Sequence, residues 1–237
     1  MRRTLLTAFA VVGMFAMTAK AGFTTVNPTP AMYGPEDSIS EILSHQFGGT
    51  FVANGADFTN GTITAHRADD NDDQIIDSGR LDSATAIAAF SAAAQTFGVF
   101  MGTSGGSFDQ LFAVSGYGYN ITGDVSGLNL PGALRLGRGG GSSTWSSQNS
   151  DNSDGADHMV AYEIQGANLA KPTHIVFFED TGLQHGDFDY NDLAVLITER
   201  PAPPPSAVPL PAALIPGLMT LCGGGFIARK KARRLLV

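Results

Sequence analysis

The feature that most constrains the fold is a series of short apolar runs separated by glycine, asparagine and aspartate. The runs contain aromatic and β-branched residues, which favour strands, and dipeptides such as Asn60-Gly61 and Gly105-Gly106 favour tight turns between them. Many short strands with little helix predict a single antiparallel β-sandwich-like domain. The predicted strands are Gln46–Val52, Gly61–Arg67, Thr96–Met101, Leu111–Val114, Gly118–Thr122, Met159–Gln165, Thr173–Glu179 and Asp192–Thr198.

Two stretches differ from this pattern. Residues 82–95 are rich in alanine, begin with residues that can cap a helix and place Ile87 and Phe90 at helical spacing, which predicts one short helix. Residues 137–154 are polar and rich in glycine, which predicts a long surface loop. Trp145, within that loop, either docks the loop onto the domain or exposes an aromatic ring for stacking on carbohydrate.

Residues 1–21 have the features of a secretory signal peptide. Two arginines precede an apolar stretch that is too short to span a bilayer, and Ala19 and Ala21 supply the small residues of a cleavage site. We expect signal peptidase to cut after Ala21. The exported domain is then predicted to comprise residues 22–200.

The other end of the chain predicts a membrane segment. A proline-rich spacer at 201–207 precedes an uncharged apolar stretch, Val208–Ala228, which is long enough to cross a hydrocarbon core of about 30 Å. The basic cluster ARKKARR follows it directly. Because basic residues stay on the cytoplasmic side, the chain upstream of the segment is predicted to lie outside the cytoplasm.

Residues 208–237 resemble a PEP-CTERM sorting signal of the VPLPA type. The motif is Val208, Pro209, Leu210, Pro211 and Ala212, followed by the apolar span and the basic cluster. The resemblance implies recognition and cutting by an exosortase, a membrane protease-transpeptidase. The protein would be anchored transiently in the cytoplasmic membrane and would then reach the cell surface or the extracellular matrix.

The charge of the exported part is strongly negative. Only six of the 14 Lys and Arg lie between the two ends, against all 22 Asp and Glu, so this part carries a net charge of about −16. Such a surface repels nucleic acid and attracts divalent cations. The only cysteine, Cys222, lies in the sorting tail, so the exported domain has no disulfide.

The most informative segment is the predicted connection between the last two strands. It carries six oxygen-bearing side chains: Glu179, Asp180, Asp187, Asp189, Asn191 and Asp192. Such a set suits Ca²⁺, which takes six to eight oxygen ligands. The spacing is not that of an EF-hand, because Asp192 stands where glycine is required and Thr198 where glutamate is required. The alternative is that these residues cap turns by bonding backbone amides.

The strings Phe178-Glu179-Asp180 and Gly186–Asp192 also resemble a domain of unknown function that recurs in exported PEP-CTERM and cyanobacterial proteins. The resemblance covers residues 154–199 and implies a β-sandwich with a calcium site, without a known reaction. A second acidic segment has related spacing and is predicted to be a solvated turn rather than a metal site; its residues are Asp69, Asn71, Asp73 and Asp77.

No arrangement in the sequence predicts catalysis. Gly102–Gly106 matches the G-x-S-x-G nucleophile elbow, but the βα alternation that an elbow requires is missing from the pattern. We therefore expect a non-enzymatic surface or matrix protein with a calcium site. The alternative is a domain that binds or cleaves extracellular polysaccharide, with Trp145, Tyr117 and Tyr119 as stacking candidates.

Overall fold

A computed structural model describes residues 24–27, 36–68, 75–77, 80–91, 93–130, 132–140, 143–166, 168–182 and 187–201. The chain divides into two compact units after Pro201, and the description below concerns the first unit. The predicted signal peptide, the spacer beyond Pro201 and the predicted sorting tail lie outside the described residues. Among the described residues, no helix has the length and apolar character needed to span a membrane.

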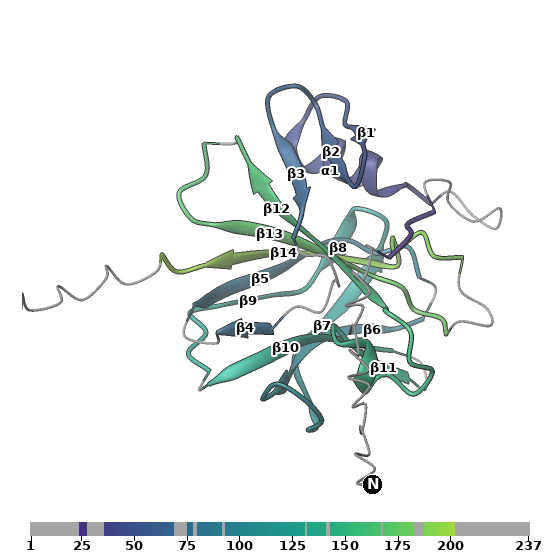
Figure 1. The fold of residues 1–237 in the computed structure, drawn as a ribbon, viewed down its shortest axis with the longest axis vertical. Coiled ribbons are helices and arrows are strands. Elements are labelled where there is room, and N and C mark those ends of the chain that lie inside the picture. The colour runs from purple at the N-terminus through teal and green to yellow at the C-terminus, as the bar shows by residue number, and fades with distance from the viewer. Residues whose placement is uncertain are drawn as a thin grey trace, which may run out of the picture. The chain divides into compact units, whose positions relative to one another are not determined.

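The described residues form two antiparallel sheets with one α-helix and one short 3-10 helix (Figure 1). The elements are α1 (Ile39–Phe47), β1 (Val52–Asn54), β2 (Asp57–Thr59), β3 (Thr64–Arg67), β4 (Ile75–Asp77), β5 (Leu81–Ala88), β6 (Gln95–Met101), β7 (Phe108–Tyr117), β8 (Asn120–Thr122), β9 (Asp124–Ser126), β10 (Ala133–Gly140), β11 (Ser143–Ser146), the 3-10 helix Asn149–Asp151, β12 (Met159–Gln165), β13 (Thr173–Phe178) and β14 (Leu193–Glu199).

The two sheets form the layers of a sandwich, as predicted. The first sheet has eight strands in the order β1-β2-β3-β12-β13-β14-β5-β9. The second has six strands, in the order β11-β10-β6-β7-β8 with β4 also paired to β10. Mainly β architecture with one short α-helix is therefore confirmed for the described residues.

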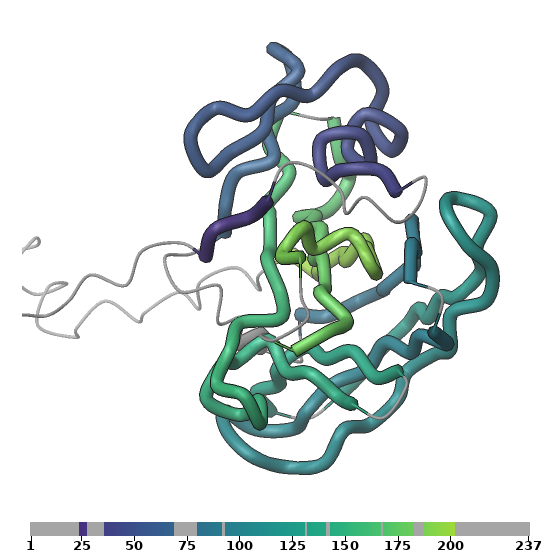
Figure 2. Tube along the Cα trace, turned by 90° about the vertical axis from the view of Figure 1, so that its right-hand side faces the viewer, coloured from purple at the N-terminus to yellow at the C-terminus, as the bar shows by residue number. Residues whose placement is uncertain are grey.

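The first sheet is buried on both faces. Side chains such as Val176 and Phe178 pack with the second sheet, and their neighbours Ile175 and Phe177 pack with α1 on the opposite face. Figure 2 shows this layering, with the purple α1 and the teal second sheet on opposite sides of the green β12–β14. Burial on two faces explains why these strands are nearly continuous apolar runs in the sequence.

The α-helix lies where no helix was predicted, because its signal is a short capping motif. Ser38 and Glu41 form a capping box, in which the Ser38 backbone N–H donates to the Glu41 carboxylate at 2.8 Å. Ile39, Ile42 and Leu43 form the buried face. The strand predicted at Gln46–Val52 is therefore wrong, since its first residues end this helix and only Val52 begins β1.

The helix predicted at 82–95 is also wrong. Residues up to Ala88 form β5, in which Ala84, Ala86 and Ala88 are buried while Thr85 is exposed. Because buried positions recur about every second residue, these alanines face the packed interior. Ala84 and Ala86 lie between the two sheets and Ala88 lies on the side of α1, where small side chains fit. Alanine content indicated a helix, but tertiary packing selected the strand.

The loop predicted at 137–154 is wrong over most of its length. Its first residues belong to β10, and Ser143–Ser146 form β11, which pairs with β10. Arg138 and Trp145 are buried there. The glycines of β10 are required by close packing, because an added Cβ on Gly137 would lie 2.6 Å from the Phe100 ring.

Candidate functional site

The ends of two central strands bring three carboxylates together. Glu179 and Asp180 follow β13 directly, and Asp192 precedes β14, whose first residue Leu193 pairs with Phe178. Carboxylate oxygens of Glu179, Asp180 and Asp192 lie within 4.8 Å of one another. The Asp180 backbone N–H donates to the Asp192 carboxylate at 2.7 Å. We call these three residues the strand-end group.

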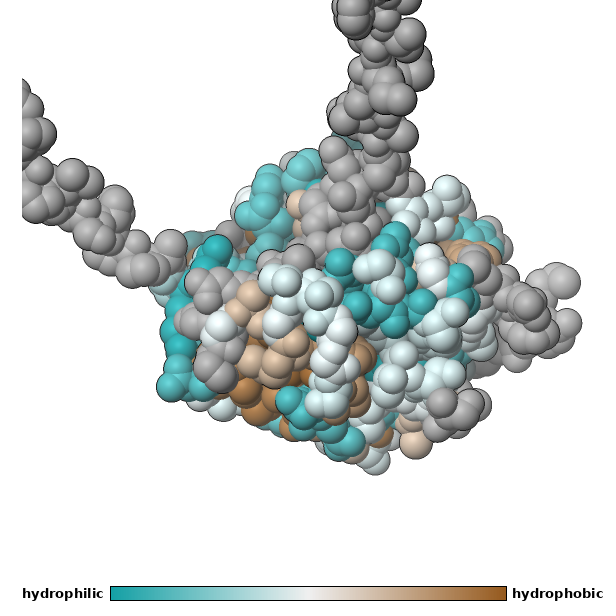
Figure 3. Space-filling model, turned by 60° about the horizontal axis from the view of Figure 1, so that its bottom comes forward, coloured by the Kyte–Doolittle hydropathy of each residue, from teal (hydrophilic) through white to brown (hydrophobic). Residues whose placement is uncertain are grey.

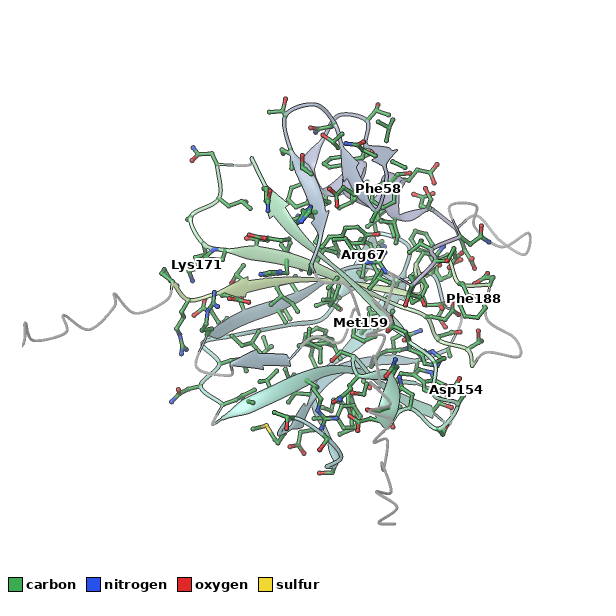
Figure 4. The ribbon with its side chains drawn as sticks, viewed as in Figure 1. Phe58, Arg67, Asp154, Met159, Lys171 and Phe188 are labelled. Carbon is green, nitrogen blue, oxygen red and sulfur yellow. The ribbon has the colours of Figure 1, made fainter. Side chains whose placement is uncertain are left out.

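A second group contains a residue that the sequence analysis missed. Asp187 and Asp189, in the connection between β13 and β14, lie with Glu36, and one carboxylate oxygen from each falls within 4.8 Å of the others. We call these three residues the loop group. Glu36 precedes α1 and is distant in the sequence, so no local spacing indicated it. Figure 4 shows Phe188 and Asp154 at the same end of the sandwich, opposite Lys171.

Packing holds the residues that follow Asp187 and Asp189 in a strained backbone conformation. Phe188 and Tyr190 have φ angles of 59° and 56°, a region that costs a non-glycine residue roughly 1–2 kcal/mol. Tyr190 is fully buried and its hydroxyl donates to the Asp157 carbonyl at 3.0 Å, while Phe188 packs against the core beside α1. These aromatic anchors fix the alternate residues, Asp187 and Asp189.

Asn191 connects this loop to the segment before α1. Its side-chain amide donates to the Asp37 carbonyl at 3.1 Å and to the Asp189 carboxylate at 2.9 Å. Asp189 is only 2% exposed. The predicted ligands Asp187 and Asp189 therefore lie in the loop group, Asn191 braces that group, and Glu179, Asp180 and Asp192 lie in the strand-end group.

Three of the clustered carboxyls have raised pKa values. Burial raises the pKa of Asp192 to about 9, assisted by the charges of Asp180 and Glu179. Burial, with Asp187 and Asp180, also raises the pKa of Glu179, although Thr181 donates to its carboxylate. The pKa of Glu36 is raised by burial and by the negative charges of Asp187 and Asp180. In these three carboxyls the charged form is therefore disfavoured, and both groups offer carboxylate oxygens that could hold a metal ion.

The strand-end group has an internal cation. The guanidinium of Arg138 is 1% exposed, donates to the Asp180 carbonyl at 3.2 Å and lies 3.7 Å from the Asp180 carboxylate. Burial lowers the pKa of Arg138, and the charges of Asp180, Asp192 and Glu179 oppose that shift. Among the ion pairs of the described residues, none joins a cation to Glu36 or Asp187.

The three predicted stacking aromatics have different environments. Trp145 is 6% exposed, stacks on His158 at 3.8 Å between ring centroids and donates to the Asp180 carbonyl at 3.1 Å. Its buried ring therefore anchors β11 to the rest of the domain. Tyr119 stacks on His45 and donates to Asp37 at 2.6 Å. Tyr117 is 44% exposed. Partial burial and then the charges of Glu36 and Asp192 raise its pKa, so it lies near both groups.

The other predicted sites carry no cluster of metal ligands or nucleophile arrangement in the described part of the chain. Gly102–Gly106 is a turn between β6 and β7 with no helix after it, so the elbow alternative is excluded. No described histidine belongs to either carboxylate group. Asp69, Asn71 and Asp73 lie outside the described residues, and of Asp77 only the backbone in β4 is described.

No protein-family model and no curated protein matches the chain. Among solved structures, the Chromobacterium violaceum lectin CV2L in complex with alpha-methyl-fucoside is similar over 54% of this chain and 96% of that chain, with 20% sequence identity and a TM-score of 0.34. At this TM-score the likeness carries no argument about a function or a site.

Proposed function

We propose that the chain is an exported, non-enzymatic surface or matrix protein whose loop group binds Ca²⁺. The observation that carries the proposal is the meeting of Glu36 with Asp187 and Asp189, from segments far apart in sequence. All three ligands are carboxylates, which suit a hard cation, and bidentate carboxylates with water reach the six to eight oxygens of Ca²⁺. The ion would join the segment before α1 to the β13–β14 connection.

In this proposal the calcium site is the loop group and not the strand-end group. In the strand-end group, Arg138 already supplies one positive charge at Asp180, and Ser91 donates to the same carboxylate. At the loop group, calcium binding would offset the mutual repulsion of the three carboxylates. Glu179 connects the two groups, because its carboxylate accepts the Phe188 backbone N–H at 3.1 Å.

Thermal unfolding of the full chain in excess Ca²⁺ and in EDTA tests the calcium site. A ligand at about 100 times its Kd stabilises the folded state by about 2.7 kcal/mol, which corresponds to about 5–10 °C in Tm for a domain of this size. We expect Glu36→Gln and Asp189→Asn to abolish the difference. Asp109→Asn, which alters an exposed carboxylate on β7, is the matched control and should retain it. Coincident curves for the unmodified protein would refute the site.

Export and sorting need a separate test. Deleting Val208–Ala212 should leave the chain uncut in the cytoplasmic membrane, since the exosortase would lose its recognition motif. Deleting Pro203–Ala207 from the spacer is the control and should permit release. Normal release of the first variant would contradict the sorting part of the proposal while leaving the calcium site untouched.

Carbohydrate binding at the same end of the domain is a second candidate function. It is favoured by Tyr117, an exposed aromatic whose hydroxyl lies within the field of Glu36 and Asp192. Native exopolysaccharide should retain the protein in a pull-down, and Tyr117→Ala should reduce retention. Trp145→Ala is no test of stacking, because that ring is buried. Release of oligosaccharide during the incubation would indicate cleavage and contradict the non-enzymatic assignment.

A further inference from the structure

On the outer face of the second sheet, Gly98, Gly137 and Gly139 form a patch without side chains, which we call the glycine floor. The strand register places Gly137 beside Gly98, and Gly139 between Thr96 and Thr144. Along β10, Leu136, which precedes Gly137, and Leu134 pack in the core between the sheets. Because side chains alternate along a strand, the glycines face outward and leave the backbone bare.

Two phenylalanine rings lie directly on this floor. A Cβ built on Gly98 would lie 2.7 Å from Cζ of Phe108, and one built on Gly139 would lie 3.1 Å from Cε1 of the same ring. Phe100 covers Gly137 in the same way, and the two ring centroids are 5.5 Å apart. Arg135 lies over Phe100 at 5.4 Å, which leaves Phe108 as the accessible, half-buried ring.

A groove with a volume of about 480 Å³ lies beside Phe108. Neutral polar side chains line it: Thr96, Gln110, Ser143 and Thr144. Within the described part of the chain, the side chains of Gln110, Ser143 and Thr144 have no hydrogen-bond partner. The Thr96 hydroxyl donates to the Gly139 carbonyl at 3.0 Å and keeps its acceptor capacity. Among the described residues that line the groove none is ionisable, in a domain that is strongly acidic.

These features together fit one class of ligand. An aromatic ring offers a face to C–H groups, and free amide and hydroxyl groups offer donors and acceptors to hydroxyls, so the lining matches a pyranose ring. The described lining residues offer no cationic side chain to a phosphate or polyanion and no carboxylate to a polycation. The volume lies in the range of small-ligand sites. Figure 3, which turns the lower side of Figure 1 toward the viewer, shows apolar residues there bordered by residues of intermediate hydropathy and by hydrophilic residues.

We propose that the groove at Phe108, on the outer face of the second sheet, binds a neutral saccharide. The site shares no residue with the carboxylate groups or with Tyr117, so binding there does not depend on calcium. Phe108 supplies the stacking surface and Gln110 and Thr144 supply the directional hydrogen bonds. The glycine floor permits close approach, since a side chain on Gly139 would displace either Thr96 or Phe108.

Calorimetric titration of the full chain in EDTA tests the proposal. The probes are cellohexaose, maltohexaose and mannohexaose, with oligogalacturonate and a glucosamine hexamer as charged comparators. We expect at least one neutral hexasaccharide to bind with a Kd of about 1 mM or tighter. Phe108→Ala should weaken binding at least tenfold, and Gln110→Ala about three- to tenfold.

Control variants separate this site from the calcium-bearing end. Gln165→Ala removes an exposed glutamine from the other sheet, and Tyr117→Ala removes the exposed aromatic near the carboxylates; both should bind like the unmodified protein. Because Gln110 is exposed on β7, its variant should fold even if Phe108→Ala does not. The proposal is overturned by the absence of binding to all neutral probes at 5 mM, by tighter binding of a charged comparator, or by loss of binding in Tyr117→Ala with Gln110→Ala unaffected.

Discussion

The metal-free protein should lose stability as pH rises, and Asp192 should cause much of the loss. The pKa of this carboxyl is about 9 in the folded chain, against an ordinary value of 3.8, because it is buried beside Asp180 and Glu179. Between these values the folded chain holds a proton that the unfolded chain has released. Stability therefore falls with rising pH, by about 1.4 kcal/mol per unit for one proton. From pH 5 to pH 8 the upper limit is about 4 kcal/mol.

Urea unfolding in EDTA at several pH values between 5 and 8 measures this effect. Asp192→Asn replaces the protonated carboxyl with a neutral group of the same shape, and its amide oxygen can still accept the Asp180 backbone N–H. The free energy of unfolding of the unmodified protein, relative to this variant, should fall by about 2–4 kcal/mol from pH 5 to pH 8. Asp109→Asn should run parallel to the unmodified protein. A constant difference between the unmodified protein and Asp192→Asn would refute the reasoning.

Three further predictions concern the framework around the site. Arg138→Met should destabilise the protein by about 3 kcal/mol in urea unfolding, since it leaves the strand-end carboxylates without their cation; a loss below about 1 kcal/mol would contradict this. Gly98→Ala should cost about 1–3 kcal/mol because its Cβ would lie 2.3 Å from the Asp109 carbonyl oxygen, and unchanged stability would show that β7 moves freely. Ser38→Ala should lower the free energy of unfolding by about 1 kcal/mol through loss of the capping box, whereas an unchanged value would show that packing alone holds α1.

Strands that are buried on both faces were predictable from the sequence. β12 has the predicted bounds, β13 ends one residue earlier than predicted, and β14 is shifted by one residue at each end. Each is a short apolar run of β-branched and aromatic residues that ends in polar residues, so periodicity and composition agree. The acidic residues at the ends of β13 and β14 were predictable for the same reason, because their positions follow from the strands.

Elements determined by long-range packing were not predictable. β5 is an alanine-rich strand because it crosses a crowded interior, and composition alone favours a helix there. β10 is rich in glycine because the rings of Phe100 and Phe108 lie against its backbone at Gly137 and Gly139, and composition alone favours a loop. Glu36 joins Asp187 only through the packing of the segment before α1 against the last hairpin. In each case the decisive partner lies far away in the sequence.

The proposed calcium site would couple two segments that are far apart in the sequence. In the strand-end group Arg138 is fixed in the core beside Asp180, so the folded protein carries its own counterion there. In the loop group the burial of Asp189 and the strained backbone at Phe188 and Tyr190 raise the free energy of the metal-free state. In the proposed calcium-bound state, the cation offsets the repulsion among Asp187, Asp189 and Glu36 only when the segment carrying Glu36 is in place. In this proposal the loop group links the order of the last hairpin to that of the segment before α1. A change that disturbs either segment should therefore weaken calcium binding at the shared site.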